Sequence, residues 1–149
     1  MGGSFSLWSN GERASRGVAI LFNTDQGVVI KKDKKDNDGR VLPCEIKIEN
    51  QIYNLINIYC PNNNAERKQL ILSIDRYMYL DIDGPTYNIL NGDFNCVLDK
   101  KKLDRLPSRS YDQQGTTELR DLILKCNLTD IGRDQNQIIK KYTFQRGKV

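Results

Sequence analysis

The stretch Tyr87-Asn88-Ile89-Leu90-Asn91-Gly92-Asp93-Phe94-Asn95 joins a short apolar run to a segment that carries a carboxylate and a carboxamide. Residues 87–90 predict a buried strand. Because successive strand residues point to opposite faces, Asp93 and Asn95 share a face if the extended form continues. Asp93 can then accept a proton or bind Mg²⁺ through oxygen, and Asn95 can donate to a phosphate oxygen. The alternative is an ordinary turn, which Asn-Gly and Gly-Asp pairs also favour.

Length and composition are typical of one globular domain. The chain has 149 residues, of which 38% are hydrophobic and 28% are charged. Its net charge of +4 is compatible with a polyanionic partner without identifying one. The sequence contains neither an apolar run long enough to span a membrane nor a secretion signal. The four cysteines, Cys44, Cys60, Cys96 and Cys126, lack zinc-type spacing and predict reduced core thiols. We therefore expect an intracellular protein of the nucleus or cytoplasm that is not secreted and has no membrane partner.

The absence of histidine narrows the possible chemistry. The chain contains no histidine at all. A Ser-His-Asp triad, a Cys-His pair and histidine ligation of a metal are therefore excluded. Acid–base chemistry can come only from Asp, Glu, Tyr, Lys or a metal-bound water.

The first part of the chain predicts antiparallel strands joined by turns. The predicted strands are residues 17–22, 27–30, 42–48 and 52–59. The first two are expected to be neighbours, joined by turn residues 23–26. The mixed charges of residues 31–40 indicate a solvated hairpin tip, with a DNA-contacting loop as the alternative. Pro61 ends the last of these strands, because proline cannot extend a central strand.

The second part predicts two amphipathic helices. Residues 65–80 repeat apolar side chains at the helical period, and Asn63 with Glu66 resembles an N-cap box. A second helix covers residues 119–126, with Thr116 or Thr117 as its cap. Residues 99–114 form a polar, basic loop, and residues 141–144 are β-prone. Strands followed by helix, strand, helix and strand predict an α/β or α+β layered fold.

Several segments of the chain, in this order and spacing, carry a family resemblance. They are Ser15-Arg16-Gly17-Val18-Ala19-Ile20-Leu21-Phe22, Tyr59-Cys60-Pro61-Asn62, Asn91-Gly92-Asp93-Phe94-Asn95-Cys96-Val97-Leu98, Leu128-Thr129-Asp130-Ile131 and Tyr142-Thr143-Phe144. Together they resemble the endonuclease/exonuclease/phosphatase family, in the branch found in non-LTR (LINE-type) retrotransposon polyproteins. The resemblance covers roughly residues 15–147. It implies that residues 1–149 form a single partial domain of this family. It implies an α/β fold, specifically a four-layer α/β sandwich, and phosphodiester cleavage that depends on Mg²⁺, with Mn²⁺ as a second candidate.

The resemblance also implies roles for individual side chains. Asp93 orients or deprotonates the attacking water, and Asn95 binds the scissile phosphate or the metal, so both are candidate metal ligands. Tyr59 touches the phosphate, and Asn62 supports its loop. These roles suit phosphodiester chemistry, which needs a hard cation, an activated water and donors for the developing charge.

Two further residues are candidate substrate contacts. Thr143 matches a polar position of the family that can contact DNA, and Arg16 can meet a phosphate. Each has an ordinary alternative. Taken by themselves, Tyr59 and Thr143 are typical strand residues, and Arg16 is equally typical of an exposed surface.

The sequence also departs from the family pattern. A full family domain begins with a strand bearing an Asn and a strand ending in the Glu that is its principal Mg²⁺ ligand, and neither precedes Ser15. The family's closing Asp-containing strand and Ser-Asp-His segment do not occur before Val149. We therefore expect an incomplete sandwich, truncated at both ends, with half of the catalytic set, marginal stability and little activity.

The function implied by the resemblance is DNA nicking that primes reverse transcription. DNA is then the substrate, and a reverse transcriptase domain is expected in the parent polyprotein. One alternative is a non-catalytic nucleic-acid-binding remnant that uses Arg16, residues 31–40 and residues 100–109 on phosphates. Another is a phosphatase of the same fold that acts on inositol phosphates or phospholipids.

Overall fold

The computed structural model describes residues 3–11, 16–23, 27–33, 36–79, 86–98 and 115–136. Its elements are β1 (Ser4–Asn10), β2 (Gly17–Asn23), β3 (Val29–Asp33), β4 (Val41–Ile48), β5 (Gln51–Tyr59), α1 (Asn64–Leu72), the 3-10 helix η2 (Ile74–Tyr77), β6 (Thr86–Asp93), α2 (Thr116–Lys125) and α3 (Ile131–Gln135). This is a mixed α/β structure of sheets and a few helices, as predicted. The four-layer sandwich itself stays a prediction. No helix in the described ranges has the length and apolar character needed to cross a membrane.

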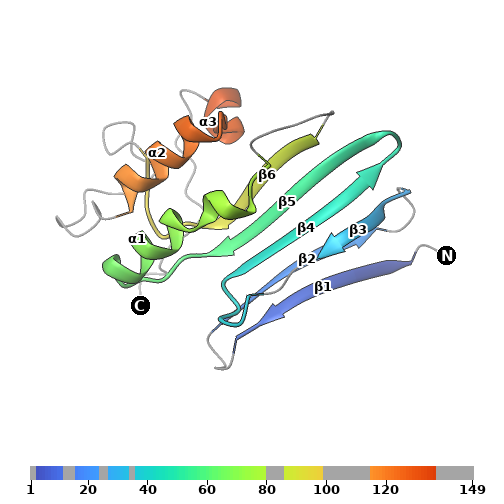
Figure 1. Ribbon diagram of the computed structural model, residues 1–149, viewed down its shortest axis with the longest axis horizontal. Coiled ribbons are helices and arrows are strands. Elements are labelled where there is room, and N and C mark those ends of the chain that lie inside the picture. Colours follow the sequence, from blue (N-terminus) through green and yellow to red (C-terminus); the bar gives the residue numbers. More distant parts are fainter. Residues whose placement is uncertain are drawn as a thin grey trace.

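The strands form two sheets. The larger has the order β3-β4-β5-β6, and the smaller pairs β1 with β2. All pairs are antiparallel except β5 with β6, which is parallel. A parallel pair needs a crossover connection, and α1 lies in the chain between these two strands (Figure 1).

Each face of the larger sheet packs on a separate apolar cluster. One cluster joins the sheet to the helices and consists of Val41, Ile56, Ile58, Cys60, Ile71, Ile74, Met78, Leu119 and Leu122. The other joins the sheet to β1 and β2 and consists of Leu7, Val18, Phe22, Leu42, Cys44 and Ile46. The two clusters take alternate residues of β4 and β5, as the two-residue period of a strand requires. Figure 1 shows the helices and the β1–β2 pair at opposite sides of the larger sheet.

The partner of the strand at residues 17–22 differs from the prediction. β2 pairs with β1, a strand that the sequence analysis did not find, and β3 joins the other sheet next to β4. β2 is also only half-buried, since Leu21 is 73% exposed. The continuous apolar run at residues 17–22 is therefore a strand of a two-stranded sheet with one open face.

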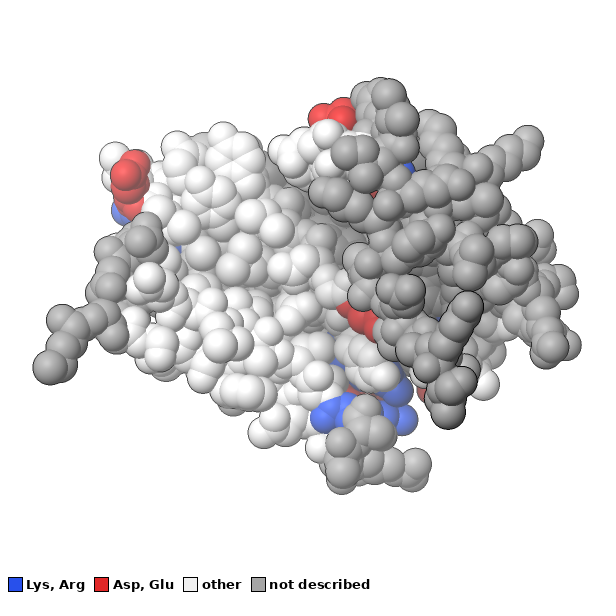
Figure 2. Space-filling view, turned by 180° about the vertical axis from the view of Figure 1, so that it is seen from behind, with Lys and Arg blue, Asp and Glu red and all other residues white. Residues whose placement is uncertain are grey.

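The strand before the Gly-Asp-Phe-Asn segment is present but is not buried. β6 is the last strand of its sheet, and the side chains of Tyr87 and Ile89 are 53% and 41% exposed. Apolar composition predicted burial, but the apolar cluster between the larger sheet and the β1–β2 pair includes no residue of β6, so the face that carries Tyr87 and Ile89 is left open in the described part of the chain. Seen from behind, the molecule has a broad surface almost without charge (Figure 2).

The helices are shorter and more divided than predicted. Asn63 caps α1 as expected, because its side chain accepts hydrogen bonds from Ala65 N and Glu66 N. α1 ends at Leu72, however, and η2 follows. α2 is capped by Gly115 with φ of 100°, not by either threonine. α3 was not predicted, and the predictions for residues 99–114 and 141–144 lie outside the described residues.

Gly92 allows β6 to approach β5. Its φ of 128° lies where side chains are strained, and a Cβ at this position would overlap the carbonyl oxygen of Ile58. Only glycine can adopt this backbone without strain while leaving that space empty. The parallel pairing next to the candidate site therefore depends on one missing side chain.

We predict that Gly92→Ala destabilises the fold by at least about 3 kcal/mol, because it combines backbone strain with a backbone overlap. The control is Gly27→Ala, which also has a positive φ, 64°, in the less strained left-handed region, and has no atom within 4 Å of the added Cβ. That control should cost only about 1–2 kcal/mol. Urea unfolding followed by circular dichroism measures both, and equal losses would contradict the overlap.

Candidate functional site

The candidate site lies where the parallel strands β5 and β6 end. Tyr59 and Asp93 are the last residues of their strands and are partners in the parallel register. Register partners have their side chains on the same face of the sheet. The structure thus brings together a phenol and a carboxylate that are far apart in the sequence. Tyr59 is half-buried and Asp93 is exposed.

Asp93 and Asn95 are related by a turn, not by an extended strand. Asn95 has φ of 48°, and its backbone N–H donates to Asp93 Oδ1 at 2.9 Å. A carboxylate that accepts from the N–H two residues later forms an Asx-type turn. The expectation that Asp93 and Asn95 share a face of a continuing strand is therefore wrong, and the turn alternative is confirmed.

Cys60 connects the two strand ends through its backbone. Its N–H donates to Asp93 O at 2.8 Å, and its carbonyl accepts from Asn95 Nδ2 at 2.7 Å. Burial, with Cys96 nearby, raises the pKa of the Cys60 thiol to about 12. The thiol is therefore neutral at physiological pH, which makes it a poor nucleophile. The side-chain amide of Asn95 thus links the turn after β6 to the end of β5. Cys60 takes part in the site through its backbone N–H and carbonyl, and its thiol has no role there.

Arg67 supports the loop after β5, which sequence reasoning did not find. Its side chain is buried, with 2% of the residue exposed. Its Nη1 donates to Asn62 O at 3.1 Å and to Pro61 O at 3.3 Å, and its Nη2 donates to Asn64 Oδ1. Asn62 itself is exposed and takes part through its backbone. The signal in the sequence was an arginine on the helix face that packs on the sheet, where a buried charge needs hydrogen-bond partners.

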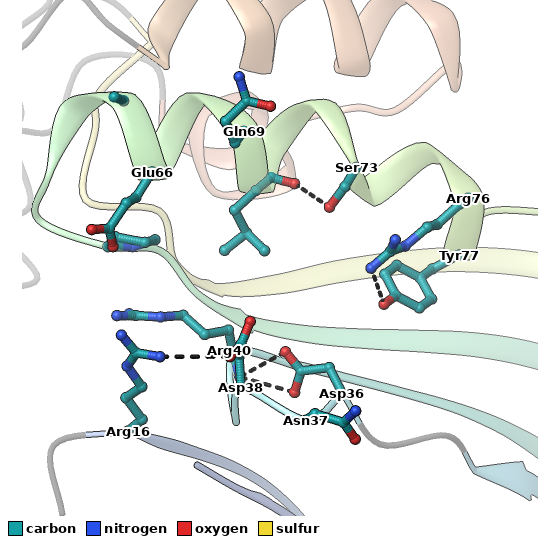
Figure 3. Close-up of a pocket in the computed structure, with 13 residues that line it drawn as sticks. Arg16, Asp36, Asn37, Asp38, Arg40, Glu66, Gln69, Ser73, Arg76 and Tyr77 are labelled. Atoms are coloured by element: carbon teal, nitrogen blue, oxygen red, sulfur yellow. Dashed lines mark hydrogen bonds and ion pairs between the residues drawn. The ribbon is translucent and has the colours of Figure 1, made fainter. Parts of the chain in front are cut away.

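Arg40 lies against Tyr59, and Arg16 lines the same cleft as Arg40. The guanidinium of Arg40 is 5.1 Å from the centre of the Tyr59 ring, and its Nη1 donates to Tyr59 O at 3.3 Å. Arg16, which the sequence analysis singled out, is 3.7 Å from the exposed carboxylate of Asp38. Both arginines line a cleft of about 850 Å³ between the hairpin tip and α1. Figure 3 shows both at one end of this cleft, with Arg76 at the other end.

The hairpin tip has a structural role at its base. Asp36 Oδ1 accepts from the hydroxyl of Ser9 at 2.8 Å, and both Asp36 carboxylate oxygens accept from Arg40 N at 3.0 Å. These bonds fix the start of β4 against β1. Residues 34–35 of the tip, the basic loop at residues 100–109 and Thr143 lie outside the described residues. Their predicted contacts with DNA stay predictions.

The donors present fit a magnesium ion only in part. In the described part of the chain no three His, Cys, Asp or Glu side chains are grouped as a metal site. Asp93 contributes one carboxylate, and Asn95 carries an amide oxygen beside it. Mg²⁺ in phosphate-processing sites keeps several waters and binds through one or two carboxylates plus substrate phosphate. The residues suit a Mg²⁺ held jointly with a phosphate, not one held by protein atoms only.

Comparison with known proteins gives one informative relative. No family model matches the chain. The chain is 32% identical over 132 residues to the "Transposon TX1 uncharacterized 149 kDa protein" of Xenopus laevis. This alignment covers 89% of the chain and 10% of the relative, so the chain spans about a tenth of the length of that protein. The likeness supports the expected kinship with transposon proteins, whereas the endonuclease family stays a prediction.

We predict that Asn95→Asp destabilises the protein by about 1–3 kcal/mol, because it replaces the donor to Cys60 O with a negative oxygen. The matched control is Asn91→Asp, an exposed position on β6, two residues before Asp93, that adds the same charge near Asp93. The control should stay within about 0.5 kcal/mol of the wild type. Urea unfolding measures both, and a control as damaging as Asn95→Asp would show that charge, not the lost hydrogen bond, is responsible.

Proposed function

We propose that this chain is part of a Mg²⁺-dependent DNA endonuclease encoded by a retrotransposon, and that its nick in target DNA primes reverse transcription. The observation that carries the proposal is the parallel register of Tyr59 with Asp93, which unites the two side chains at the carboxyl ends of adjacent strands. Sites of α/β sheets gather at such ends. The likeness to a transposon protein supports a transposon origin for the chain.

The chemistry assigned to each residue follows from its surroundings. Asp93 is exposed, so its carboxylate can orient or deprotonate a water and can bind a metal. Asn95 retains amide atoms that the bond to Cys60 does not use, and Tyr59 offers a phenol donor beside them. A bound Mg²⁺ would neutralise charge that develops on the phosphate. Asp93 and Asn95 are the residues that would hold it.

A second candidate is a nucleic-acid-binding domain without catalysis. It is favoured by the absence of a three-residue acidic metal site among the described residues, together with the arginines Arg16 and Arg40 near the strand ends. Binding of this kind needs no Mg²⁺ and weakens steeply with salt. The two candidates therefore differ in their response to EDTA.

The proposal extends to partners and location. DNA is the proposed substrate, and the proposed parent protein carries a reverse transcriptase that extends the nicked strand. A DNA substrate implies action in the nucleus. The chain spans about a tenth of the length of its relative, so these statements concern the proposed parent protein.

We predict slow nicking of supercoiled plasmid by the 149-residue chain in Mg²⁺ and none in EDTA. Asp93→Ala should reduce the rate at least about a hundredfold, which is typical for loss of a general base. The matched control is Asp121→Ala, an exposed carboxylate on α2 that should keep the wild-type rate. Conversion of supercoiled to open-circular plasmid on agarose gels gives the rates.

The possible outcomes separate the two candidates. Nicking that survives EDTA or Asp93→Ala would come from another enzyme or another site and would contradict the proposal. Absence of nicking, with DNA binding that does not depend on Mg²⁺, would leave the non-catalytic candidate. Equal losses in Asp93→Ala and Asp121→Ala would assign the effect to general charge, not to the strand ends.

A further inference from the structure

Three side chains form a row across the ends of three adjacent strands. Tyr59 N donates to Arg40 O at 2.8 Å, immediately beyond the last antiparallel pair of Val41 with Ile58. Tyr59 is in turn the parallel partner of Asp93. Arg40, Tyr59 and Asp93 therefore follow one another at the spacing of neighbouring strands, which is about 4.8 Å per step.

The Arg40 side chain is held along this row. Its guanidinium lies over the Tyr59 ring at 5.1 Å and donates one hydrogen bond to Tyr59 O. A guanidinium has five N–H donors, and among the described residues this one uses a single donor. The Tyr59 ring and the Tyr59 carbonyl together fix the plane of the Arg40 guanidinium. Its remaining N–H groups can donate to an oxygen of a ligand. A rigid, half-buried guanidinium of this kind suits a phosphate.

Three carboxylates, those of Asp36, Asp38 and Glu66, line the cleft with Arg40, and among the described residues none of them forms an ion pair with its guanidinium. Asp36 uses its carboxylate oxygens on Ser9 and on the Arg40 backbone, not on the guanidinium. Asp38 Oδ1 is 3.7 Å from Arg16 Nη1, so this carboxylate pairs with Arg16. The Asp38 side chain is 77% exposed. Figure 3 shows the Arg16 and Arg40 guanidinium groups at the same end of the cleft. Two neighbouring guanidinium groups repel one another unless an anion lies between or beside them.

We propose that Arg40 is a phosphate-binding residue of the site, and that the DNA backbone crosses the row from Asp93 past Tyr59 to Arg40, toward Arg16. The scissile phosphate lies at Asp93, and the neighbouring phosphate of the same strand lies at Arg40. This inference rests on the proposed function, because it names how the same site holds its substrate. It assigns this role to one residue of the segment 31–40, which the sequence analysis named only as a range.

The test compares two arginines of the same cleft. Arg76 is the matched control for Arg40, since its guanidinium also stacks on a tyrosine, at 4.7 Å from the Tyr77 ring, at the other end of the cleft. Binding of a fluorescein-labelled duplex of about 20 base pairs is measured by anisotropy in EDTA, over a series of NaCl concentrations. EDTA prevents cleavage, so this experiment measures binding only.

We predict that Arg40→Gln weakens DNA binding about tenfold. The variant should also lower the magnitude of the slope of log association constant against log [NaCl] by about 1, which is the value of one phosphate contact. Arg76→Gln should stay within about twofold of the wild type and keep its slope. Arg40→Lys should keep the slope but lose affinity, because it retains the charge without the fork. Equal effects of Arg40→Gln and Arg76→Gln would overturn the assignment.

The design separates failure of this inference from failure of the proposed function. If the wild type binds DNA in a salt-dependent way but shows no Mg²⁺-dependent nicking, the proposed catalysis is overturned. The role of Arg40 in binding is then still decided by comparing Arg40→Gln with Arg76→Gln. No binding by the wild type in EDTA overturns the assignment of Arg40, whereas the nicking assay in Mg²⁺ decides the proposed function separately. If urea unfolding shows that Arg40→Gln is not folded, Arg40→Lys against Arg76→Lys decides, and equal affinities of these two variants overturn the assignment.

Discussion

The close parallel approach of β6 to β5 is the constraint on which the rest of the structure depends. It places Asp93 beside Tyr59, and it is possible because Gly92 leaves room for the Ile58 carbonyl. The polar ends of the two strands are then joined, since Cys60, which follows β5, donates to the last residue of β6 and accepts from the turn that follows β6. A one-residue shift of this register would turn the Asp93 side chain to the face of the sheet opposite Tyr59.

Buried polar side chains secure both ends of this strand pair. At the site end, Arg67 binds the carbonyls of the loop after β5. At the other end, Asn54 Nδ2 donates to Tyr77 O and to Asn88 Oδ1, both at 2.8 Å, and so ties the sheet to the end of η2. Buried polar groups cost stability unless they are paired. Here each of these groups is paired, so the irregular segments at the two ends are specified as closely as the apolar core.

Much of the fold could be predicted from the sequence because periodicity reports burial locally. The alternation in residues 42–48 and the cap at Asn63 were read correctly for that reason. The misses have non-local causes. The partner of β2 depends on a strand of mixed polarity, Ser4–Asn10, that shows no strong period, and the exposure of Tyr87 depends on β6 lying at an edge. For the site, the residue types were found, but the sequence left a strand and a turn open at Asn95, because local residue types in Asn-Gly-Asp-Phe-Asn are compatible with both.

The connection between β5 and β6 has a consequence for how the protein folds. β4 and β5 are joined by a tight hairpin, with Ile48 the partner of Gln51, whereas β5 and β6 can pair only after α1 and η2 have been placed between them. Closing a long connection costs more chain entropy than closing a hairpin, and it occurs later when local contacts form quickly. For this entropic reason, the meeting of Tyr59 with Asp93 follows formation of the β4–β5 hairpin. A chain that is still folding can therefore contain its hairpins before the Tyr59–Asp93 site has formed.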